Sequence, residues 1–450
     1  MMKLPPELQN LQRVSVFGMG KSGVAAVRLL KSVGIETHAI NEGAVDVWRA
    51  KDGLDAILSS EYLHTQDDAL EIFASSGLIV ISPGIPTTHP ALAMANAAGV
   101  MVISEIELAY WFCRSVPVVA VTGTNGKTTT TTMIFEALKL AGKKVFCGGN
   151  IGIPYCEMAE KAWAGETFDF AVIEVSSFQL ETIRAFHPRI GLMLNLTPNH
   201  SERYTSVEDY GRAKLRLLLN MQAGDDLIVG EEAGDWIEWS AGTKATRHVF
   251  AKKNLPADFL KRFDFSKGVL VGAHNRANYF CAWKTLTLLD IPDLDRLFQN
   301  FIEKFAGVEH RLEYVGTFDG LKVYNDAKST NGEATRTALA AFEGSEDLFL
   351  IVGGKLRNET DRLLPDLLAF KGRVKKIFTI GMTADRLVKE LSGDFVTEAA
   401  HTLDQVFQLA KTQRLQGNLV FSPAHPSFDQ FKNYVDRGQQ FKTKARSILA

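Results

Sequence analysis

A strand, a glycine-rich loop and a helix follow one another near Val118–Thr129, and this arrangement constrains the fold more than any other part of the sequence. The β-branched and mostly apolar run Val118–Thr122 predicts a strand, and Gly123–Thr128 predicts a tight loop that opens a helix. A helix is expected next because apolar residues recur at helical spacing, namely Met133, Ile134, Ala137, Leu138 and Ala141. Loops of this kind hold a nucleoside triphosphate, since their backbone N–H groups and the positive end of the helix face the phosphates.

The loop fits the phosphate-binding pattern with one departure. Lys127 would reach the β- and γ-phosphate oxygens, and Thr128 would ligate Mg²⁺. Val121 stands where the pattern has its first glycine. The alternative is a glycine turn that only caps a helix, but the Lys-Thr pair after an apolar strand favours phosphate binding. We therefore predict a protein that uses ATP and contacts it through Gly123, Thr124, Asn125, Gly126, Lys127, Thr128 and Thr129.

Length and charge exclude several classes of protein. A chain of 450 residues exceeds one compact domain. Lys and Arg number 50 against 52 Asp and Glu, so no strong field favours nucleic acid or an anionic membrane. The first residues lack the apolar core of a signal peptide, and no apolar run approaches the roughly 20 residues of a membrane span. Four cysteines without C-x-x-C pairs fit a reducing compartment, and we expect a soluble, cytoplasmic protein.

Strand-like runs alternate with helical patterns nearly throughout, which predicts an α/β protein with parallel sheets. Three blocks are expected, with boundaries near residues 104 and 308. The expected strands lie at 13–17, 35–40, 78–81, 118–122, 170–175, 190–194, 323–324, 348–352, 376–380 and 419–421, and one helix is expected over 207–221.

Two residues at strand ends are candidates for the chemistry. Glu174 belongs to an otherwise apolar strand, where a carboxylate is costly unless it is paired or bound to a metal. In phosphate-loop proteins such an acid often helps to hold Mg²⁺, although a strand-end acid in a surface turn is the alternative. His200 follows the next strand, and α/β proteins bind ligands at the carboxyl ends of strands. A surface or capping histidine is the alternative there.

Lys214 shares one face of the expected helix 207–221 with Tyr210 and Leu217, so it points inward. A helical lysine usually extends its amine to solvent. A buried one instead has a lowered pKa and offers a neutral, nucleophilic amine. The residues alone leave both interpretations open.

Gly18-x-Gly20-x-x-Gly23 follows a strand and precedes a helix, as in dinucleotide-binding proteins. The acidic residue expected after the next strand is replaced by Asn41-Glu42. The glycine turn therefore indicates binding of some diphosphate but does not indicate that this diphosphate is a nicotinamide cofactor. In the last block, Tyr324–Thr330 and Ser422–Phe431 place polar groups after strands. They could orient a small charged substrate or simply cap helices.

Taken together, the motifs resemble the Mur ligase family over essentially the whole chain. The family's motifs occur in its order, at Thr122–Thr128, Gly148–Gly152, Glu174–Glu181, Tyr210–Lys214, His274–Asn278, Glu309–Arg311 and Asn325–Thr330. The run 176–181 and the tail Ser422–Gly438 resemble the branch that adds D-glutamate. The resemblance implies a Rossmann-like UDP-binding domain (1–104), a central P-loop ATPase domain with a mostly parallel sheet (105–307) and a Rossmann-like amino-acid-binding domain (308–450).

The resemblance also implies an activity: an ATP-dependent ligase, acting as a monomer, that joins D-glutamate to UDP-N-acetylmuramoyl-L-alanine through an acyl phosphate in peptidoglycan precursor synthesis. One Mg²⁺ would lie on Thr128 and Glu174, and a second on His200 and Lys214, the lysine being carbamylated by CO₂. Lys127, Glu174, His200 and Lys214 would be catalytic. The implied nucleotide contacts are Asn278 and Asp326 to adenosine and Arg311 to the phosphates. The implied substrate contacts are Gly18, Gly20, Lys21, Ser22, Gly23, Asn41, Ser82, Gly84, Asn150, Ser176, Lys328, Thr330, Arg357, Ser427, Phe428 and Tyr434.

Three positions depart from the family pattern. Asn199 replaces the Asp before the histidine, Gly353–Asn358 lacks an Asp and the last Gly of its motif, and His425-Pro426 replaces small residues. The alternatives are a related ligase for another amino acid or for folate, a nucleotide-dependent switch, and a nicotinamide-dependent dehydrogenase. The sequence lacks the Asp-Asn-Pro-Arg run of the diaminopimelate- or lysine-adding branch.

Overall fold

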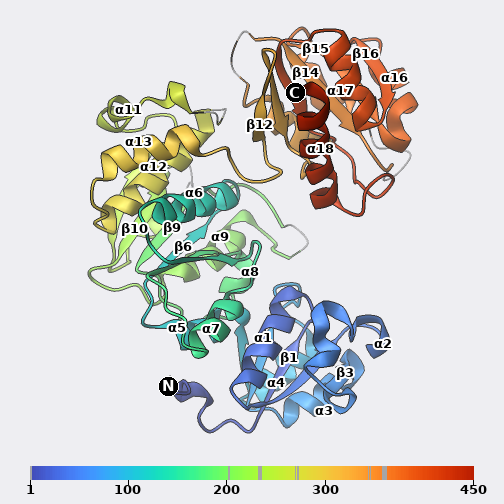
Figure 1. The fold of residues 1–450 in the computed structure, drawn as a ribbon. Helices are drawn as coiled ribbons and strands as arrows, with labels where there is room; N and C mark the ends of the chain where they lie inside the picture. The colour runs from blue at the N-terminus through green and yellow to red at the C-terminus, as the bar shows by residue number, and fades with distance from the viewer. Residues whose placement is uncertain are drawn as a thin grey trace. The chain divides into compact units, whose positions relative to one another are not determined.

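Three sheets organise the chain (Figure 1). The structure, a computed structural model, describes residues 3–200, 203–231, 236–268, 270, 273–342, 344, 346–356 and 362–450. They form two compact units, the first built from Met1–Arg262 with Asn278–Phe298 and the second from Phe263–Ala277 with Gln299–Ala450. Within these described ranges all strand pairs are parallel except one, which confirms the predicted α/β class with mostly parallel sheets.

The first sheet has the order β3-β2-β1-β4-β5 and lies in the first unit. Its strands are β1 (Arg13–Phe17), β2 (Glu36–Asn41), β3 (Leu63–Thr65), β4 (Leu78–Ile81) and β5 (Met101–Ser104). Its helices are α1 (Lys21–Ser32), α2 (Val45–Trp48), α3 (Ala69–Ala74), α4 (Pro90–Ala97) and α5 (Glu105–Cys113). β1 pairs with β2 on one side and with β4 on the other. The strand order therefore reverses at β1, and the turns after β1 and β4 meet where open α/β sheets bind ligands.

The second sheet, in the same unit, has the order β11-β10-β9-β6-β8-β7. Its strands are β6 (Val118–Thr122), β7 (Val145–Gly149), β8 (Phe170–Glu174), β9 (Ile190–Met193), β10 (Asp226–Gly230) and β11 (Thr246–Phe250). The accompanying helices are α6 (Lys127–Leu140), α7 (Tyr155–Trp163), α8 (Ser177–Leu180), α9 (Val207–Leu215), α10 (Trp236–Trp239), α11 (Ala257–Arg262), α12 (Ala273–Leu288) and α13 (Leu294–Lys304). One apolar core runs from the first sheet through α5 and α7 into the second, so both sheets belong to one packed unit.

The third sheet lies in the second unit and has the order β12-β13-β17-β14-β15-β16. Its strands are β12 (Glu313–Phe318), β13 (Leu321–Asn325), β14 (Leu348–Gly353), β15 (Val374–Ile380), β16 (Thr397–His401) and β17 (Gly417–Phe421), and only β12 runs antiparallel to its neighbour. The helices are α14 (Gly332–Leu339), α15 (Leu364–Leu367), α16 (Ala384–Leu391), α17 (Leu403–Thr412) and α18 (Tyr434–Leu449). Two apolar clusters cover the sheet, one of which includes residues of α17 and α18.

One expected element is shorter than predicted. Helix α9 ends at Leu215 and continues as a 3₁₀ turn over Arg216–Leu218, whereas the periodicity predicted a helix to residue 221. Helical spacing puts Val207 on the same face as Lys214, but Val207 is exposed because it begins the helix. The predicted strand boundaries differ from the observed ones by a few residues at most. Within the described part of the chain, no helix combines the length and apolar character needed to cross a membrane.

Candidate active site

The loop between β6 and α6 has the conformation expected of a phosphate-binding turn. Gly126, the residue before the helix, has φ of +81°, a left-handed conformation that favours glycine. Asn195, which follows β9, makes two side-chain hydrogen bonds to this loop. Its Oδ1 accepts from the Asn125 backbone N at 2.8 Å, and its Nδ2 donates to the Asn125 carbonyl at 3.0 Å. Its own carbonyl accepts from the Thr124 N at 2.9 Å. Sequence reasoning missed Asn195, although it is a polar residue directly after a strand.

Lys127 lies against the same loop. Its ammonium group donates to the carbonyls of Gly123 and Thr124 at 2.9 and 2.8 Å. The positive charge is therefore held at the helix N-terminus where phosphate oxygens would bind. Asn278 of α12 is adjacent, since Thr130 of α6 donates to its Oδ1 at 3.2 Å and a Cβ on Gly126 would lie 3.1 Å from that oxygen.

Glu174 connects the phosphate loop to the end of β7. Its carboxylate is 2% exposed and accepts from Thr128 Oγ1 at 2.9 Å and from Asn150 Nδ2 at 2.8 Å. The alternative of an acid in a surface turn is therefore wrong. A hydroxyl and a carboxylate side by side supply the oxygen ligands that Mg²⁺ prefers, so these residues fit a metal bound with a triphosphate. Ser176 is the N-cap residue of α8 and shares a capping box with Gln179.

Lys214 is buried, with 1% of its surface exposed, so the alternative of a solvent-directed amine is also wrong. Its Nζ donates to Thr122 Oγ1 at 3.4 Å and lies 4.5 Å from the centroid of the Tyr210 ring. Burial, reinforced by the charge of Lys127 and opposed by Glu174, lowers the pKa of this amine well below its usual value. The shift favours the neutral form of the amine.

His200 faces the same tyrosine. Its ring centroid lies 5.7 Å from that of Tyr210 and 4.8 Å from that of Phe178. Its backbone has φ of +57°. Among the residues that the structure describes, no three His, Cys, Asp or Glu side chains gather as a metal cluster.

The turn after β1 forms a second candidate binding point. Ser82, which follows β4, donates its hydroxyl to the Gly18 carbonyl at 2.5 Å, and the Met19 N donates to Asn41 Oδ1 at 2.8 Å. A Cβ on Gly23 would stand 2.0 Å from the Gly18 carbonyl oxygen, so the turn requires glycine there. The structure thus brings Gly18, Asn41 and Ser82 together. Around them, Gly20 and Lys21 are exposed and Ser22 is half-buried at the start of α1, and Gly84 is exposed after β4.

In the second unit, polar groups meet after β13 and β17. Asp326 is 5% exposed and accepts from Ser329 Oγ at 2.5 Å, Ser422 Oγ at 2.7 Å and the Leu312 N at 3.2 Å. Burial raises the pKa of this carboxyl to about 6, against the lowering effect of these bonds and of the Arg311 charge. Arg311 itself is exposed.

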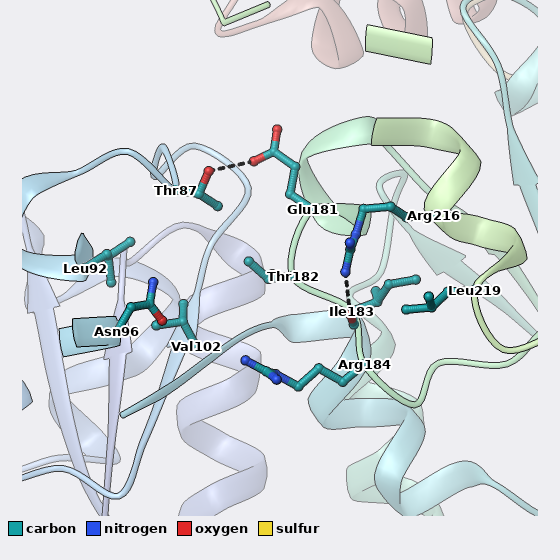
Figure 2. Close-up of a pocket in the computed structure, with 10 residues that line it drawn as sticks. All are labelled: Thr87, Leu92, Asn96, Val102, Glu181, Thr182, Ile183, Arg184, Arg216 and Leu219. Atoms are coloured by element: carbon teal, nitrogen blue, oxygen red, sulfur yellow. Dashed lines mark hydrogen bonds between the residues drawn. The ribbon is translucent and has the colours of Figure 1, made fainter. Parts of the chain in front are cut away.

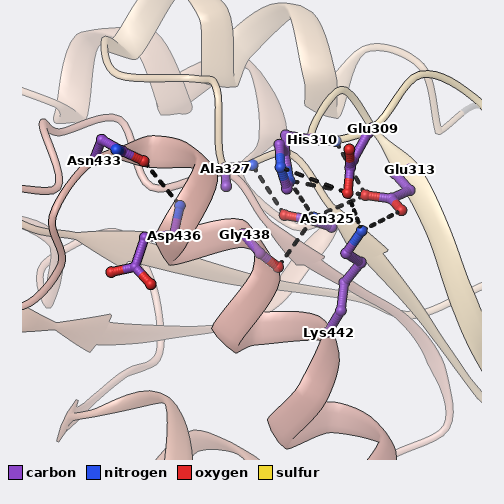
Figure 3. Close-up of polar contacts among 9 residues, drawn as sticks. All are labelled: Glu309, His310, Glu313, Asn325, Ala327, Asn433, Asp436, Gly438 and Lys442. Carbon is purple, nitrogen blue, oxygen red and sulfur yellow. Dashed lines mark hydrogen bonds and ion pairs between the residues drawn. The ribbon is translucent and has the colours of Figure 1, made fainter. Parts of the chain in front are cut away.

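A polar network fastens α18 to the residues just before β12 (Figure 3). Lys442 pairs with Glu309 at 2.6 Å and with Glu313 at 3.0 Å. Asn325 Nδ2 donates to Glu313 Oε2 at 2.9 Å and to Nδ1 of the buried His310 at 3.0 Å. The His310 carbonyl in turn accepts from the Lys328 N at 3.2 Å, so the network positions the start of the Lys328 loop.

The tail Ser422–Phe431 is held against that loop by Arg437. This arginine is fully buried and donates to the carbonyls of His425 and Ala327, both at 2.8 Å. Burial lowers its pKa to about 10. Two of the three departures also meet here, because the Lys355 N donates to the Pro426 carbonyl at 2.8 Å.

The remaining predicted residues of this unit lie around the same loops. Lys328 Nζ is 5.8 Å from the centroid of the Tyr434 ring. Thr330 is half-buried, Ser427 is buried and Phe428 is 65% exposed. Arg357 lies outside the described residues.

Comparisons with known proteins agree with this arrangement. Residues 12–104 match the Mur ligase MurD-like N-terminal domain, and residues 121–284 match the Mur ligase middle domain. The chain is 35% identical to the UDP-N-acetylmuramoylalanine–D-glutamate ligase of Caldicellulosiruptor saccharolyticus, over 96% of this chain and 98% of that protein. It is 36% identical to the ligase of the same name from Myxococcus xanthus, over 97% and 98%.

Solved structures support the fold. MurF ligase from Thermotoga maritima in complex with ADP has a TM-score of 0.55 at 14% identity, covering 99% of this chain and 97% of that one. The UDP-N-acetylmuramate-alanine ligase MurC from the same organism has a TM-score of 0.52 at 16% identity, covering 97% and 100%. The full-length identity to the curated ligases goes further than a shared fold. The chain belongs to the Mur ligase family.

Proposed function

We propose that this chain is the ATP-dependent ligase that joins D-glutamate to UDP-N-acetylmuramoyl-L-alanine in peptidoglycan precursor synthesis. One observation carries the assignment: the buried Glu174 carboxylate bonded to both Thr128 of the phosphate loop and Asn150. This contact joins an ATP-phosphate site to a neighbouring polar site in one unit. The relatives with about 35% identity, which carry the name of this activity, support the choice of substrates.

The reaction has two steps. An oxygen of the alanyl carboxylate attacks the γ-phosphorus of ATP, ADP leaves, and an acyl phosphate forms. The glutamate amine then attacks the acyl carbon, the C–O bond to phosphate breaks, and the amine loses a proton to give the amide. Lys127 and the loop N–H groups would neutralise charge on the transferring phosphoryl group, and Asn150 would orient the carboxylate.

Thr128 and Glu174 would hold one Mg²⁺, and His200 and Lys214 a second. These ions supply charge neutralisation at the phosphates. We infer that Lys214 is carbamylated: its neutral amine attacks CO₂, a N–C bond forms and a proton is released. The burial of Lys214 beside Thr122 supports this, and the carbamate would supply oxygen atoms of the kind that Mg²⁺ prefers as ligands.

Each sheet would bind one reactant. The glycine turn after β1 would hold the UDP diphosphate, and the Asn41 oxygen already accepts from that turn. The second sheet would bind ATP. The loops of the third would bind glutamate through Lys328, Thr330, Ser427, Phe428 and Tyr434, with Asp326 and Arg311 meeting the nucleotide. We further propose that the protein acts as a monomer and in the cytoplasm.

Phosphate release tests the proposal. With ATP and UDP-N-acetylmuramoyl-L-alanine present, addition of D-glutamate should start release, whereas other amino acids should not. Faster turnover with L-glutamate or lysine would contradict the assignment. It would indicate that the loops around His425 and Lys355, which depart from the family pattern, change the preferred amino acid. Release that needs no amino acid would indicate a nucleotide switch, and binding of NADH but not UDP would indicate a dehydrogenase.

A further inference from the structure

A cluster around Glu181 joins the first two sheets at a point that none of the assigned binding roles uses. Glu181 follows α8, and its carboxylate accepts from Arg203 Nε at 3.0 Å, from Tyr204 Oη at 2.6 Å and from Thr87 Oγ1 at 3.2 Å. Arg203 Nη2 pairs with the same carboxylate. Both charged side chains are largely shielded, at 13% and 14% exposure, so the pair is much less screened than a surface salt bridge. We call Thr87, Glu181, Arg203 and Tyr204 the Glu181 latch.

On one side the latch reaches the turn proposed for the diphosphate. Arg203 Nη1 donates to the Ile85 carbonyl at 3.3 Å, and Thr87 is two residues further along. The Ile85 N donates to the Ser82 carbonyl at 3.0 Å, and the Ser82 hydroxyl supports Gly18. The segment 82–87 therefore contacts the glycine turn at its beginning and the latch at its end.

On the other side the latch holds the backbone of His200. The backbone N atoms of Arg203 and Tyr204 both donate to the His200 carbonyl at 3.0 Å. The Arg203 guanidinium lies 4.5 Å from the centroid of the Phe178 ring, which also faces the His200 ring. Latch and histidine are thus parts of one packed cluster.

The segment that carries Glu181 is itself fixed (Figure 2). Arg216 donates to the carbonyls of Leu180 and Ile183 at 2.8 and 2.9 Å. Figure 2 shows Glu181 reaching from this segment to Thr87, beside a cavity of about 520 Å³ between α4 and the segment 181–184. The shared apolar core joins the two sheets through α5 and α7, whereas the latch contacts lie beside this cavity, next to the glycine turn and His200.

We propose that the Glu181 latch positions two sites relative to each other. It sets the distance between the diphosphate-binding turn after β1 and the backbone of His200. The inference rests on the proposed function. A substrate held by its diphosphate at the first sheet and reacting at the second must span a fixed separation, and a small misplacement of the reacting carboxylate lowers the rate steeply. The latch would therefore govern turnover of the complete substrate and not the binding of its ends.

The test compares Glu181→Gln, Thr87→Val and the double variant with the wild-type protein. Glu208→Gln is the matched control, since Glu208 makes an ion pair with Arg212 on the exposed face of α9. We expect Glu181→Gln to lower kcat with UDP-N-acetylmuramoyl-L-alanine by about 10- to 100-fold. The KM for ATP and the affinity for UDP alone should stay within about threefold, because neither ligand spans the latch. Thr87→Val should have a smaller effect that disappears in the double variant.

Four outcomes would overturn the proposal. Unchanged kcat in Glu181→Gln, or additive effects of the two substitutions, would refute the latch while leaving the ligase assignment intact. Loss of UDP affinity in parallel with kcat would show that Glu181 only maintains the fold of the first sheet. A wild-type protein that binds UDP but releases no phosphate would overturn the proposed function and the latch together. Thr87→Val, at a half-exposed position, keeps the test decisive if Glu181→Gln does not fold.

Discussion

Replacing Lys127 with methionine separates a catalytic role from a structural one. Methionine keeps most of the aliphatic stem and removes the ammonium group, which donates to the carbonyls of Gly123 and Thr124. Charge-assisted hydrogen bonds contribute about 1.5–3 kcal/mol each. The side chain is half-buried and water can replace the donor, so we expect a loss of unfolding free energy of no more than about 2 kcal/mol. The fold should survive at ordinary temperatures.

The loss in catalysis should be larger. A positive charge aimed at the transferring phosphoryl group contributes roughly 3–4 kcal/mol to the transition state. This corresponds to a fall of about 10²- to 10³-fold in kcat/KM. Lys139→Met is the control, since Lys139 lies on the same helix, is 50% exposed and contacts Glu136 and the Phe135 ring of its own helix. It should change neither quantity.

Coupled measurement of phosphate release and of urea unfolding distinguishes the two roles. We expect Lys127→Met to be folded and nearly inactive and Lys139→Met to match the wild-type protein. A folded Lys127→Met protein with near-normal ligation would show that the loop does not bind the reacting phosphates.

Two further predictions concern buried titratable groups. Lys214→Ala should be nearly inactive and should regain part of its activity with added formate or acetate, which replace the carbamate oxygens. The wild-type protein should bind ¹³CO₂ at Lys214, which NMR detects. An unmodified Lys214 in substrate- and metal-bound crystals would contradict the carbamylation. Burial raises the pKa of Glu105 from 4.5 to about 7. The folded state therefore binds more protons than the unfolded state between these values, and stability falls as pH rises through this window, by up to about 3 kcal/mol. Glu105→Gln keeps an acceptor for the Cys156 N and should lose this dependence in urea unfolding measured from pH 4 to pH 8, whereas an unchanged pH profile would show that Glu105 titrates normally.

Local pattern was enough to predict the residues whose role depends on their own element. The phosphate loop, the acid in the apolar strand β8 and the inward face of α9 each follow from spacing within a few residues. The inward position of Lys214 was predicted in this way and is confirmed by its burial.

Residues whose role depends on strand order could not be found in the same way. Asn195 hydrogen-bonds to the phosphate loop because β9 lies beside β6 in the sheet, although the two strands are separated by about 70 residues in the sequence. Arg437 meets Ala327 because α18 crosses the ends of β13 and β17, and Glu181 meets Thr87 because two sheets share a core. Each is a polar residue of ordinary appearance in the sequence, and only the packing gives it a partner.

The fate of one oxygen atom tests the central claim most directly. UDP-N-acetylmuramoyl-L-alanine labelled with ¹⁸O in its alanyl carboxylate is incubated with the protein, ATP and D-glutamate, and the released phosphate is analysed by mass spectrometry. The acyl-phosphate route predicts phosphate that carries one ¹⁸O atom from the substrate, together with an amide product that has lost it. Phosphate that contains only unlabelled oxygen would show hydrolysis of ATP by water and would contradict the proposed ligase mechanism.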